Sequence, residues 1–157
     1  MNKALQTGIV MLSLSLTGSA GAQELSTRRP GAPLLPQGRR ATIVEGEALL
    51  PGAQASQGRA VSQRMGSFGN AWSGGAQLFW APRRSGARLS LTITVPAAGT
   101  YSIAGQFTKA PDYGVFQVGA NGRQAGQFDG FNLGRVVHSG SVALGEVPMN
   151  AGANQII

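Results

Sequence analysis

Apolar and polar residues alternate one by one through much of the second half of the chain. In the run 88–95, four aliphatic residues alternate with one serine and two threonines. A period of two places the aliphatic residues on one face of a β-strand and the hydroxyls on the other. In the run 100–107, Tyr101, Ile103 and Phe107 share one face, and a turn sequence at 96–99 lies between the two runs. The pattern predicts two successive strands.

The clearest local signal is a pair of alternating runs, 115–120 and 123–128, separated by Asn121 and Gly122. Asn-Gly predicts a type I′ hairpin, because both residues accept a positive φ angle. The turn-forming segment 109–114 precedes the hairpin and holds a lysine, an aspartate and a tyrosine. Ligand contacts concentrate in loops that a rigid β-scaffold positions, so we expect ligand-binding residues around this hairpin.

Shorter runs predict further strands at 41–44, 75–80, 135–138 and 141–147, with Ser139 and Gly140 dividing the last two. The apolar spacing of an amphipathic helix is not found in the sequence. Short strands separated by glycine, proline and asparagine turns are typical of two packed antiparallel sheets. We therefore expect an all-β fold, an antiparallel β-sandwich of jelly-roll type with negligible helix.

The last strand that the pattern predicts is short. A turn at 150–154 leads directly into Gln155, Ile156 and Ile157. We expect either a closing strand of roughly three or four residues, below the usual strand length, or a sequence truncated within that strand. A reduced closing strand leaves a sheet edge and inner aliphatic residues open, which predicts association through that edge.

The N-terminal segment has the pattern of an export signal. Lys3 is followed by an apolar run at 8–16 and by an Ala-Gly-Ala cleavage sequence at 20–22. The apolar run is shorter than the roughly 20 residues that span a bilayer, so we expect cleavage rather than a retained anchor, the alternative. We expect a signal peptide at 1–22, an Arg/Pro-rich linker at 23–41 and a β-sandwich module at 42–157 of a secreted or periplasmic protein.

The chain is basic and contains no cysteine. Thirteen Lys+Arg against six Asp+Glu give a net charge of +7. In an exported protein this charge favours solubility or attraction to anionic surface polymers over nucleic acid. The absence of cysteine excludes disulfides and lipid attachment through cysteine.

Catalytic signals are weak. The chain has one histidine, His138, in a strand-like run, and no G-x-S-x-G sequence that would present a nucleophilic serine. A metal site built on imidazole or thiolate is excluded by residue counts. We expect no enzymatic activity.

The carboxylates allow two further hypotheses. Asp112 and Asp129 flank the hairpin. One hypothesis is that they are the two catalytic carboxylates of a glycosidase. The alternative is that they form Asx turns or pair with nearby arginines. Glu45 and Glu47 alternate on one strand face, which with backbone carbonyls suits calcium.

Aromatic residues at the ends of predicted strands and in loops favour a sugar-binding surface, because apolar sugar faces stack on aromatic rings. Trp72 lies in a Gly-rich loop and is a candidate stacking platform, although a buried tryptophan is also ordinary in a sandwich. The residues before and after a hairpin lie side by side. The candidate ligand site is therefore Trp72, Asp112, Tyr113, Asp129 and Asn132.

Several of these segments together resemble a known family. They are the opening strand at 43–47, the Trp-Ser-Gly-Gly sequence at 72–75, the Pro-Ala-Ala-Gly-Thr-Tyr turn at 96–101, the hairpin sequence at 118–122 and the closing sequence at 149–156. They look like galactose-binding-like carbohydrate-binding modules of the type in families six and thirty-five. The segment 108–114 is similar to accessory β-sandwich domains of secreted bacterial glycoside-hydrolase-like proteins.

The resemblance implies a non-catalytic, carbohydrate-binding or carbohydrate-associated module of an exported bacterial protein. Its partner would be a polysaccharide or glycoconjugate, held by loops at one end of the sandwich, often beside a structural calcium. Two alternatives stay open. One is a structural or adhesive domain of the cell envelope that binds protein or anionic polymer. The other is a fragment of a secreted glycoside hydrolase.

Overall fold

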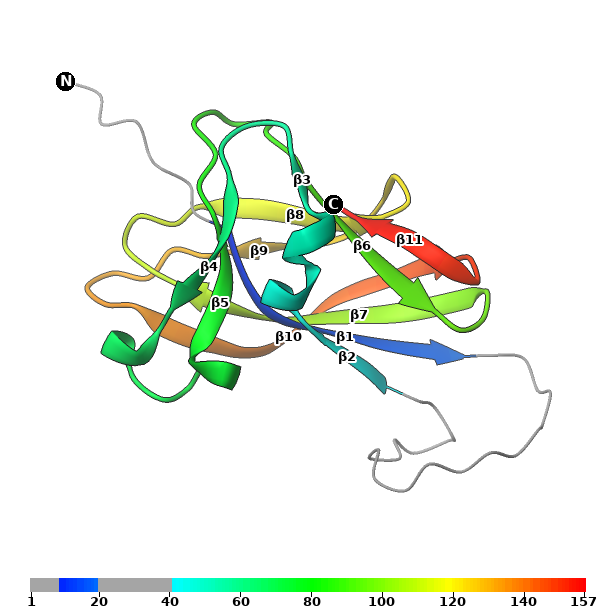
Figure 1. The fold of residues 1–157 in the computed structure, drawn as a ribbon, viewed down its shortest axis with the longest axis horizontal. Helices are drawn as coiled ribbons and strands as arrows, with labels where there is room; N and C mark the ends of the chain where they lie inside the picture. Colours follow the sequence, from blue (N-terminus) through cyan, green and yellow to red (C-terminus); the bar gives the residue numbers. More distant parts are fainter. Residues whose placement is uncertain (1–8, 20–40) are drawn as a thin grey trace.

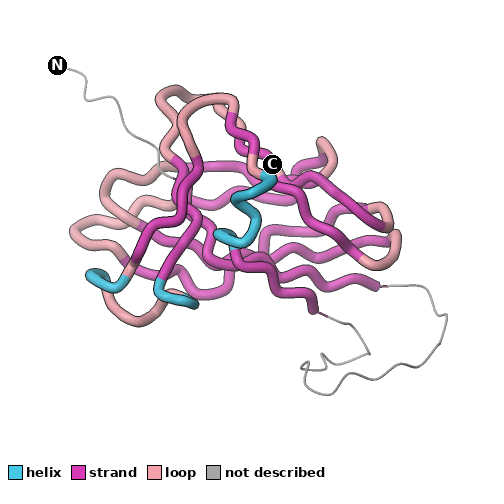
Figure 2. Tube along the Cα trace, in the orientation of Figure 1, coloured by secondary structure: helices cyan, strands magenta, loops and turns pink. Residues whose placement is uncertain are grey.

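Two antiparallel β-sheets pack against each other in the computed structural model, which describes residues 9–19 and 41–157 (Figures 1 and 2). The six-stranded sheet has the order β10-β7-β1-β5-β4, with β2 paired to β1, and the five-stranded sheet has the order β3-β6-β11-β8-β9. The fold is the all-β antiparallel sandwich that the alternation predicts.

The strands of the six-stranded sheet are β1 (Ile9–Ser19), β2 (Ala41–Glu45), β4 (Ala60–Arg64), β5 (Ala76–Trp80), β7 (Gly99–Lys109) and β10 (Val137–Met149). Those of the five-stranded sheet are β3 (Gln54–Ala55), β6 (Leu89–Val95), β8 (Val115–Ala120), β9 (Arg123–Asp129) and β11 (Gly152–Ile156). The helical segments among the described residues are three short 3-10 helices, η1 (Gly46–Gly52), η2 (Gly66–Phe68) and η3 (Ser73–Gly75).

The core lies between the sheets. The four aliphatic residues of β6 are buried, as their alternation predicts. Phe107 of β7 contacts two phenylalanines of the opposite sheet, with ring centroids 5.3 Å from Phe116 and 4.5 Å from Phe128. This aromatic cluster joins the two sheets beside the hairpin and fixes the scaffold from which the loops around the hairpin emerge.

The hairpin has the predicted turn. Strands β8 and β9 pair from Val115 with Asp129 to Ala120 with Arg123. The two turn residues have positive φ angles, 51° at Asn121 and 80° at Gly122. The Asn121 side chain also donates a hydrogen bond to Asn154 Oδ1 over 2.7 Å, which ties the turn to β11.

Two segments differ from the prediction. The runs 135–138 and 141–147 form one continuous strand, β10, with an irregularity between His138 and Ser141 in place of a break. Gly140, at a φ of 71°, absorbs that irregularity. The closing strand β11 begins at Gly152, inside the expected turn, and is five residues long. Its pairing with β6 converts turn-like residues into strand.

The apolar run that predicts an export signal forms part of the six-stranded sheet. Strand β1 pairs with β7 on one side and with both β2 and β5 on the other. Cleavage after residue 22 would remove this strand, and the export signal stays a prediction.

Residues 1–8 and 20–40, which include nearly all of the predicted linker, lie outside the described part of the chain. The described residues contain no helix that is long and apolar enough to cross a bilayer.

Candidate functional site

The segments before and after the hairpin converge at one end of the sandwich. Ala110 N–H donates to the Gly130 carbonyl over 2.9 Å, and Asn132 N–H donates to the Ala110 carbonyl over 3.1 Å. Gly130 N–H donates to the Gly114 carbonyl over 3.0 Å. We call segments 110–114 and 130–135 the hairpin-base loops. Backbone hydrogen bonds hold them together, so side chains from both reach one small surface.

Asp112 and Asp129 are exposed, but Asp129 also has a local role. Its carboxylate accepts a hydrogen bond of 2.9 Å from Phe131 N–H, which forms an Asx turn. Asn132 is half-buried and its side-chain amide donates to the Arg135 carbonyl over 2.7 Å. These two side chains therefore shape the loop 130–135, while the Asp112 side chain reaches solvent.

Tyr113 is buried, with 7% of its surface exposed. Its ring lies 6.3 Å from that of Phe79 and packs with Ala110. Burial, and to a smaller extent the negative charge of Asp112, raise the pKa of Tyr113 to about 12 against the opposing effect of a side-chain hydrogen bond with Gln77. The ring supports the hairpin-base loops from beneath and is not an open stacking surface in this structure.

Trp72 is also buried, at 5% exposure, and not a loop-exposed platform. Its indole N–H donates to Thr108 Oγ1 over 2.7 Å, and its ring meets that of His138 edge-on at 6.1 Å. The Gly-rich sequence after Trp72 forms the short 3-10 helix η3 in place of an open loop. The Trp72 side chain packs inward against Met65. The structure therefore separates Trp72 from the exposed side chains of the hairpin-base loops.

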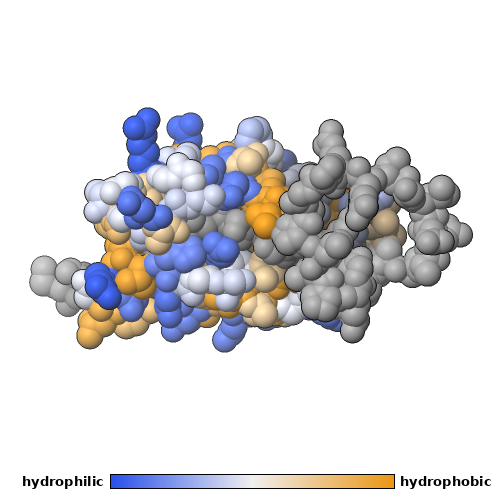
Figure 3. Space-filling model, turned by 90° about the horizontal axis from the view of Figure 1, so that it is seen from below, coloured by the Kyte–Doolittle hydropathy of each residue, from blue (hydrophilic) through white to orange (hydrophobic). Residues whose placement is uncertain are grey.

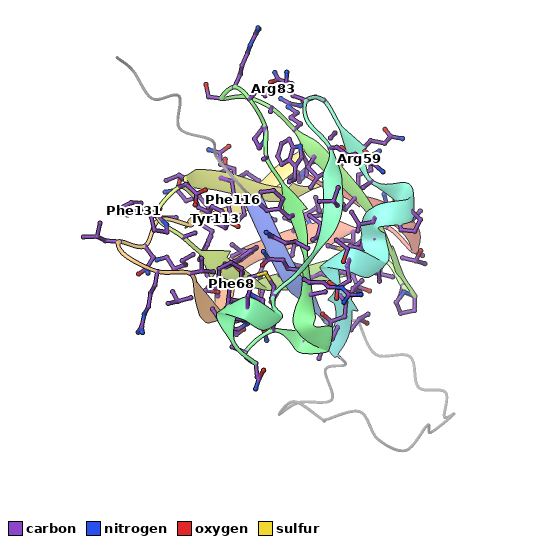
Figure 4. The ribbon with its side chains drawn as sticks, turned by 60° about the vertical axis from the view of Figure 1, so that its left-hand side comes forward. Arg59, Phe68, Arg83, Tyr113, Phe116 and Phe131 are labelled. Atoms are coloured by element: carbon purple, nitrogen blue, oxygen red, sulfur yellow. The ribbon has the colours of Figure 1, made fainter. Side chains whose placement is uncertain are left out.

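Phe131 is the aromatic residue that these loops expose, with 47% of its surface accessible. Leu133 at 84% and Val115 at 58% are exposed on the same loop and on the adjoining start of β8. Figure 4 shows Phe131 at the outer end of the molecule, whereas Tyr113 lies nearer the core. Figure 3 shows apolar surface at the left-hand end, where the loop 130–136 lies in Figure 1. An aromatic residue flanked by Gly130 and Asn132 was the sequence signal for this exposure.

His138 serves the irregular segment of β10. Its Nδ1 accepts a hydrogen bond of 2.9 Å from Gly140 N–H, and burial lowers the pKa of the imidazole. The neighbouring Ser139 hydroxyl accepts from Phe107 N–H over 2.9 Å and donates to the Gly140 carbonyl over 2.7 Å. The side chains of His138 and Ser139 thus form hydrogen bonds with backbone groups at and opposite the irregularity of β10.

Glu45 and Glu47 lie where β2 passes into η1. Glu45 Oε1 accepts a hydrogen bond of 2.9 Å from the Ser73 hydroxyl. The Oε2 atoms of both glutamates are buried, and neither has a hydrogen-bond partner among the described residues. The alternation on one strand that the sequence predicts for the pair is wrong, because Glu47 lies in η1.

A comparison with protein-family models finds no match, and a comparison with curated protein sequences finds none either.

Proposed function

We propose that this chain is a non-catalytic carbohydrate-binding or carbohydrate-associated module of an exported protein. The ligand is held on the hairpin-base loops, at one end of the sandwich. The observation that supports this proposal best is the exposed Phe131 ring on one hairpin-base loop, together with the exposed carboxylates of Asp112 on the other loop and Asp129 at the end of β9. An aromatic face stacks on the apolar face of a sugar, and Asp112 and Asp129 accept hydrogen bonds from sugar hydroxyls.

The backbone hydrogen bonds between the loops favour binding because they limit the motion that a ligand would otherwise have to arrest. The buried Tyr113 adds to this by supporting the loop from inside. Exposed side chains on loops suit an extended polysaccharide or the end of a glycoconjugate more than a small enclosed ligand.

A Phe131→Ala variant is expected to bind glycans about fivefold more weakly than the unmodified chain, because a lost ring-stacking contact costs on the order of 1 kcal/mol. Ligands would first be identified by screening the purified chain on a glycan array, and affinities then measured by calorimetry. Phe68→Ala is the matched control, because Phe68 is equally exposed, at 46% against 47%, on the separate segment η2.

Salt separates this proposal from the adhesive alternative. Stacking and neutral hydrogen bonds are not screened, so sugar binding should persist at high ionic strength. Binding that disappears with salt and is equal in the two phenylalanine variants would favour attraction of the basic surface to anionic polymer instead. The exposed Leu133 is the feature that favours an adhesive contact with protein.

Calcium at Glu45 and Glu47 forms part of the same proposal. Two buried carboxylate oxygens without hydrogen-bond donors fit a hard cation that prefers oxygen ligands, and the Ser73 hydroxyl lies at the same place. Groups of three or more acidic, histidine or cysteine side chains that fit a metal are absent from the described residues. Backbone carbonyls would have to complete the coordination.

Calcium is expected to raise the thermal unfolding midpoint of the chain, since a ligand that binds only the folded state adds about 2.7 kcal/mol at 100 times its Kd. The double variant Glu45→Gln with Glu47→Gln should lose this response. Glu146→Gln is the control, because Glu146 lies on the exposed side of β10 and bonds Ser102. An equal calcium response in both variants, or none in the unmodified chain, would remove calcium from the proposal.

A further inference from the structure

His138, the one histidine of the chain, lies where the pairing of β10 with β7 is interrupted. The regular ladder between the two strands stops at His138 and resumes at Ser141. Side chains take over in the gap. The Ser139 hydroxyl accepts from Phe107 N–H, and His138 Nδ1 accepts from Gly140 N–H, each over 2.9 Å. Because few hydrogen bonds hold this stretch, the loss of one loosens it.

The hydrogen bond from Gly140 requires a neutral imidazole. A ring nitrogen that accepts carries no proton, so the proton of the neutral ring is on Nε2. Protonation adds a hydrogen to Nδ1, which then faces the Gly140 N–H as donor against donor. Turning the ring over restores nothing, because both nitrogens of an imidazolium are donors. The bond between His138 and Gly140 therefore exists in one protonation state only.

The ring is also packed against Trp72. His138 is paired with Thr108 of β7, so the two side chains lie on the same face of the six-stranded sheet. Thr108 Oγ1 accepts from the Trp72 indole N–H, and the rings of His138 and Trp72 meet edge-on with centroids 6.1 Å apart. His138 Nε2 is buried and has no hydrogen-bond partner among the described residues. A positive charge on this ring is therefore unfavourable.

Charged side chains around the ring do not compensate for its burial. The titratable side chains carried by, or bound to, the elements packed against it are Lys109, Arg64, Arg135, Glu45 and Tyr113. The Lys109 ammonium lies over the Phe128 ring, 5.7 Å from its centroid, and the two arginines are exposed. The Glu45 carboxylate accepts from the Ser73 hydroxyl, and Tyr113 is neutral, with a pKa of about 12. Burial is the cause of the lowered pKa of the imidazole.

Val136 connects this place to the hairpin-base loops. Its side chain packs with Met65 and Trp72, and also with Ala110 and Tyr113. It lies directly before β10 and directly after one of the two loops. A displacement at the start of β10 therefore reaches the hairpin-base loops through one residue.

We propose that His138 is an acid-sensitive switch that holds the start of β10 and the Trp72 side chain in place. When the pH falls, Nδ1 takes up a proton, the hydrogen bond from Gly140 is lost and the imidazolium moves out to water. The Trp72 side chain and, through Val136, the hairpin-base loops then loosen. Folding favours the neutral ring, so the switch is closed above the ordinary histidine pKa of 6.5 and opens as the pH falls below it, through the lower pKa of the folded chain.

Amide hydrogen exchange of the full chain at about pH 7.5 and about pH 5, on either side of the ordinary histidine pKa, tests the switch. Protection factors are compared, since they remove the intrinsic effect of pH on exchange. We expect the protection factor of the Gly140 amide to fall about tenfold at the lower pH, the effect of one lost hydrogen bond.

His138→Asn is the matched variant, because the asparagine side-chain oxygen accepts the Gly140 N–H but does not titrate. The Gly140 protection factor of this variant should be the same at both pH values. An equal fall in the variant and the unmodified chain would assign the change to other groups and overturn the proposal. No fall in the unmodified chain would overturn it as well.

An NMR titration of the unmodified chain does not depend on the variant folding. One histidine gives one imidazole Cε1–H signal. The midpoint of this signal should lie below pH 6.5 and coincide with the midpoints of the Gly140 amide and Trp72 indole N–H signals. Midpoints at different pH values would overturn the proposal.

The effect of the switch on a ligand rests on the proposed function. A glycan held by the hairpin-base loops should bind about tenfold more weakly to the unmodified chain at the lower pH, and equally well to His138→Asn at both. An affinity that stays constant while the Gly140 amide opens would remove the connection through Val136. The exchange and NMR measurements need no ligand, so a chain that binds no glycan removes the proposed function while these two measurements decide the switch.

Discussion

A Gly126→Ala variant is expected to lose about 3 kcal/mol of folding stability, the upper range for inserting atoms into a filled core. A Cβ at Gly126 would lie 2.9 Å from the carbonyl carbon of Leu144 and closer still to its oxygen. The same close approach exists from the β10 side, because a Cβ at Gly145 would contact the Ala125 carbonyl of β9. Strands β9 and β10, from opposite sheets, thus approach with their backbones in contact. Backbone atoms cannot move aside as a flexible side chain would.

Urea unfolding followed by tryptophan fluorescence measures the loss. Gly66→Ala is the matched control, because a Cβ there meets nothing within 4 Å and the backbone has no positive φ. That variant should unfold at the same urea concentration as the unmodified chain. If Gly126→Ala proved as stable as Gly66→Ala, the two sheets would be able to separate locally, and the close approach would not be a requirement of the fold.

The strands that depend on local pattern could be predicted from the sequence. The alternation of β6 and the Asn-Gly turn of the hairpin are properties of neighbouring residues, so they appear in the sequence without knowledge of the fold. The convergence of the segments before and after the hairpin followed from the same turn, because the two ends of a hairpin must lie together.

The burial of the candidate site residues could not be predicted in this way. Trp72 is held by Thr108, 36 positions away in the sequence, and no local pattern encodes that partner. A tryptophan beside two glycines is equally compatible with an exposed platform and with a pocket. The continuous strand β10 has a similar origin, since its pairing with β7 carries it through the Ser139 and Gly140 irregularity. Tertiary contacts decided each of these features.

Phe131 illustrates the opposite case. Apolar residues are buried more often than not, but the turn residues Gly130 and Asn132 on either side of Phe131 are a local signal of its exposure. Its exposure follows from the Asx turn at Asp129, which directs the chain outward just after β9. The aspartate that the sequence suggested as a ligand residue therefore also positions the aromatic ring that the structure favours for binding.

A Thr108→Val variant is expected to destabilise the fold by about 3 kcal/mol, because it leaves two buried polar groups without partners at a cost of 1–3 kcal/mol each. Thr108 is 1% exposed. Its hydroxyl accepts from the Trp72 indole N–H and donates to Gln77 Oε1, and Gln77 in turn donates to Gln63 Oε1 over 2.7 Å. Valine matches threonine in shape, so packing stays the same and the hydrogen bonds alone are removed.

Two further variants separate the hydrogen bonds from other effects of the substitution, again by urea unfolding. Thr108→Ser keeps the hydroxyl and should retain most of the stability. Thr94→Val makes the same chemical change at an exposed position of β6 and should be close to neutral. If Thr108→Val were as stable as Thr108→Ser, the network would contribute nothing. The pocket that holds Trp72 would then be maintained by its packing with Met65, Val136 and the His138 ring.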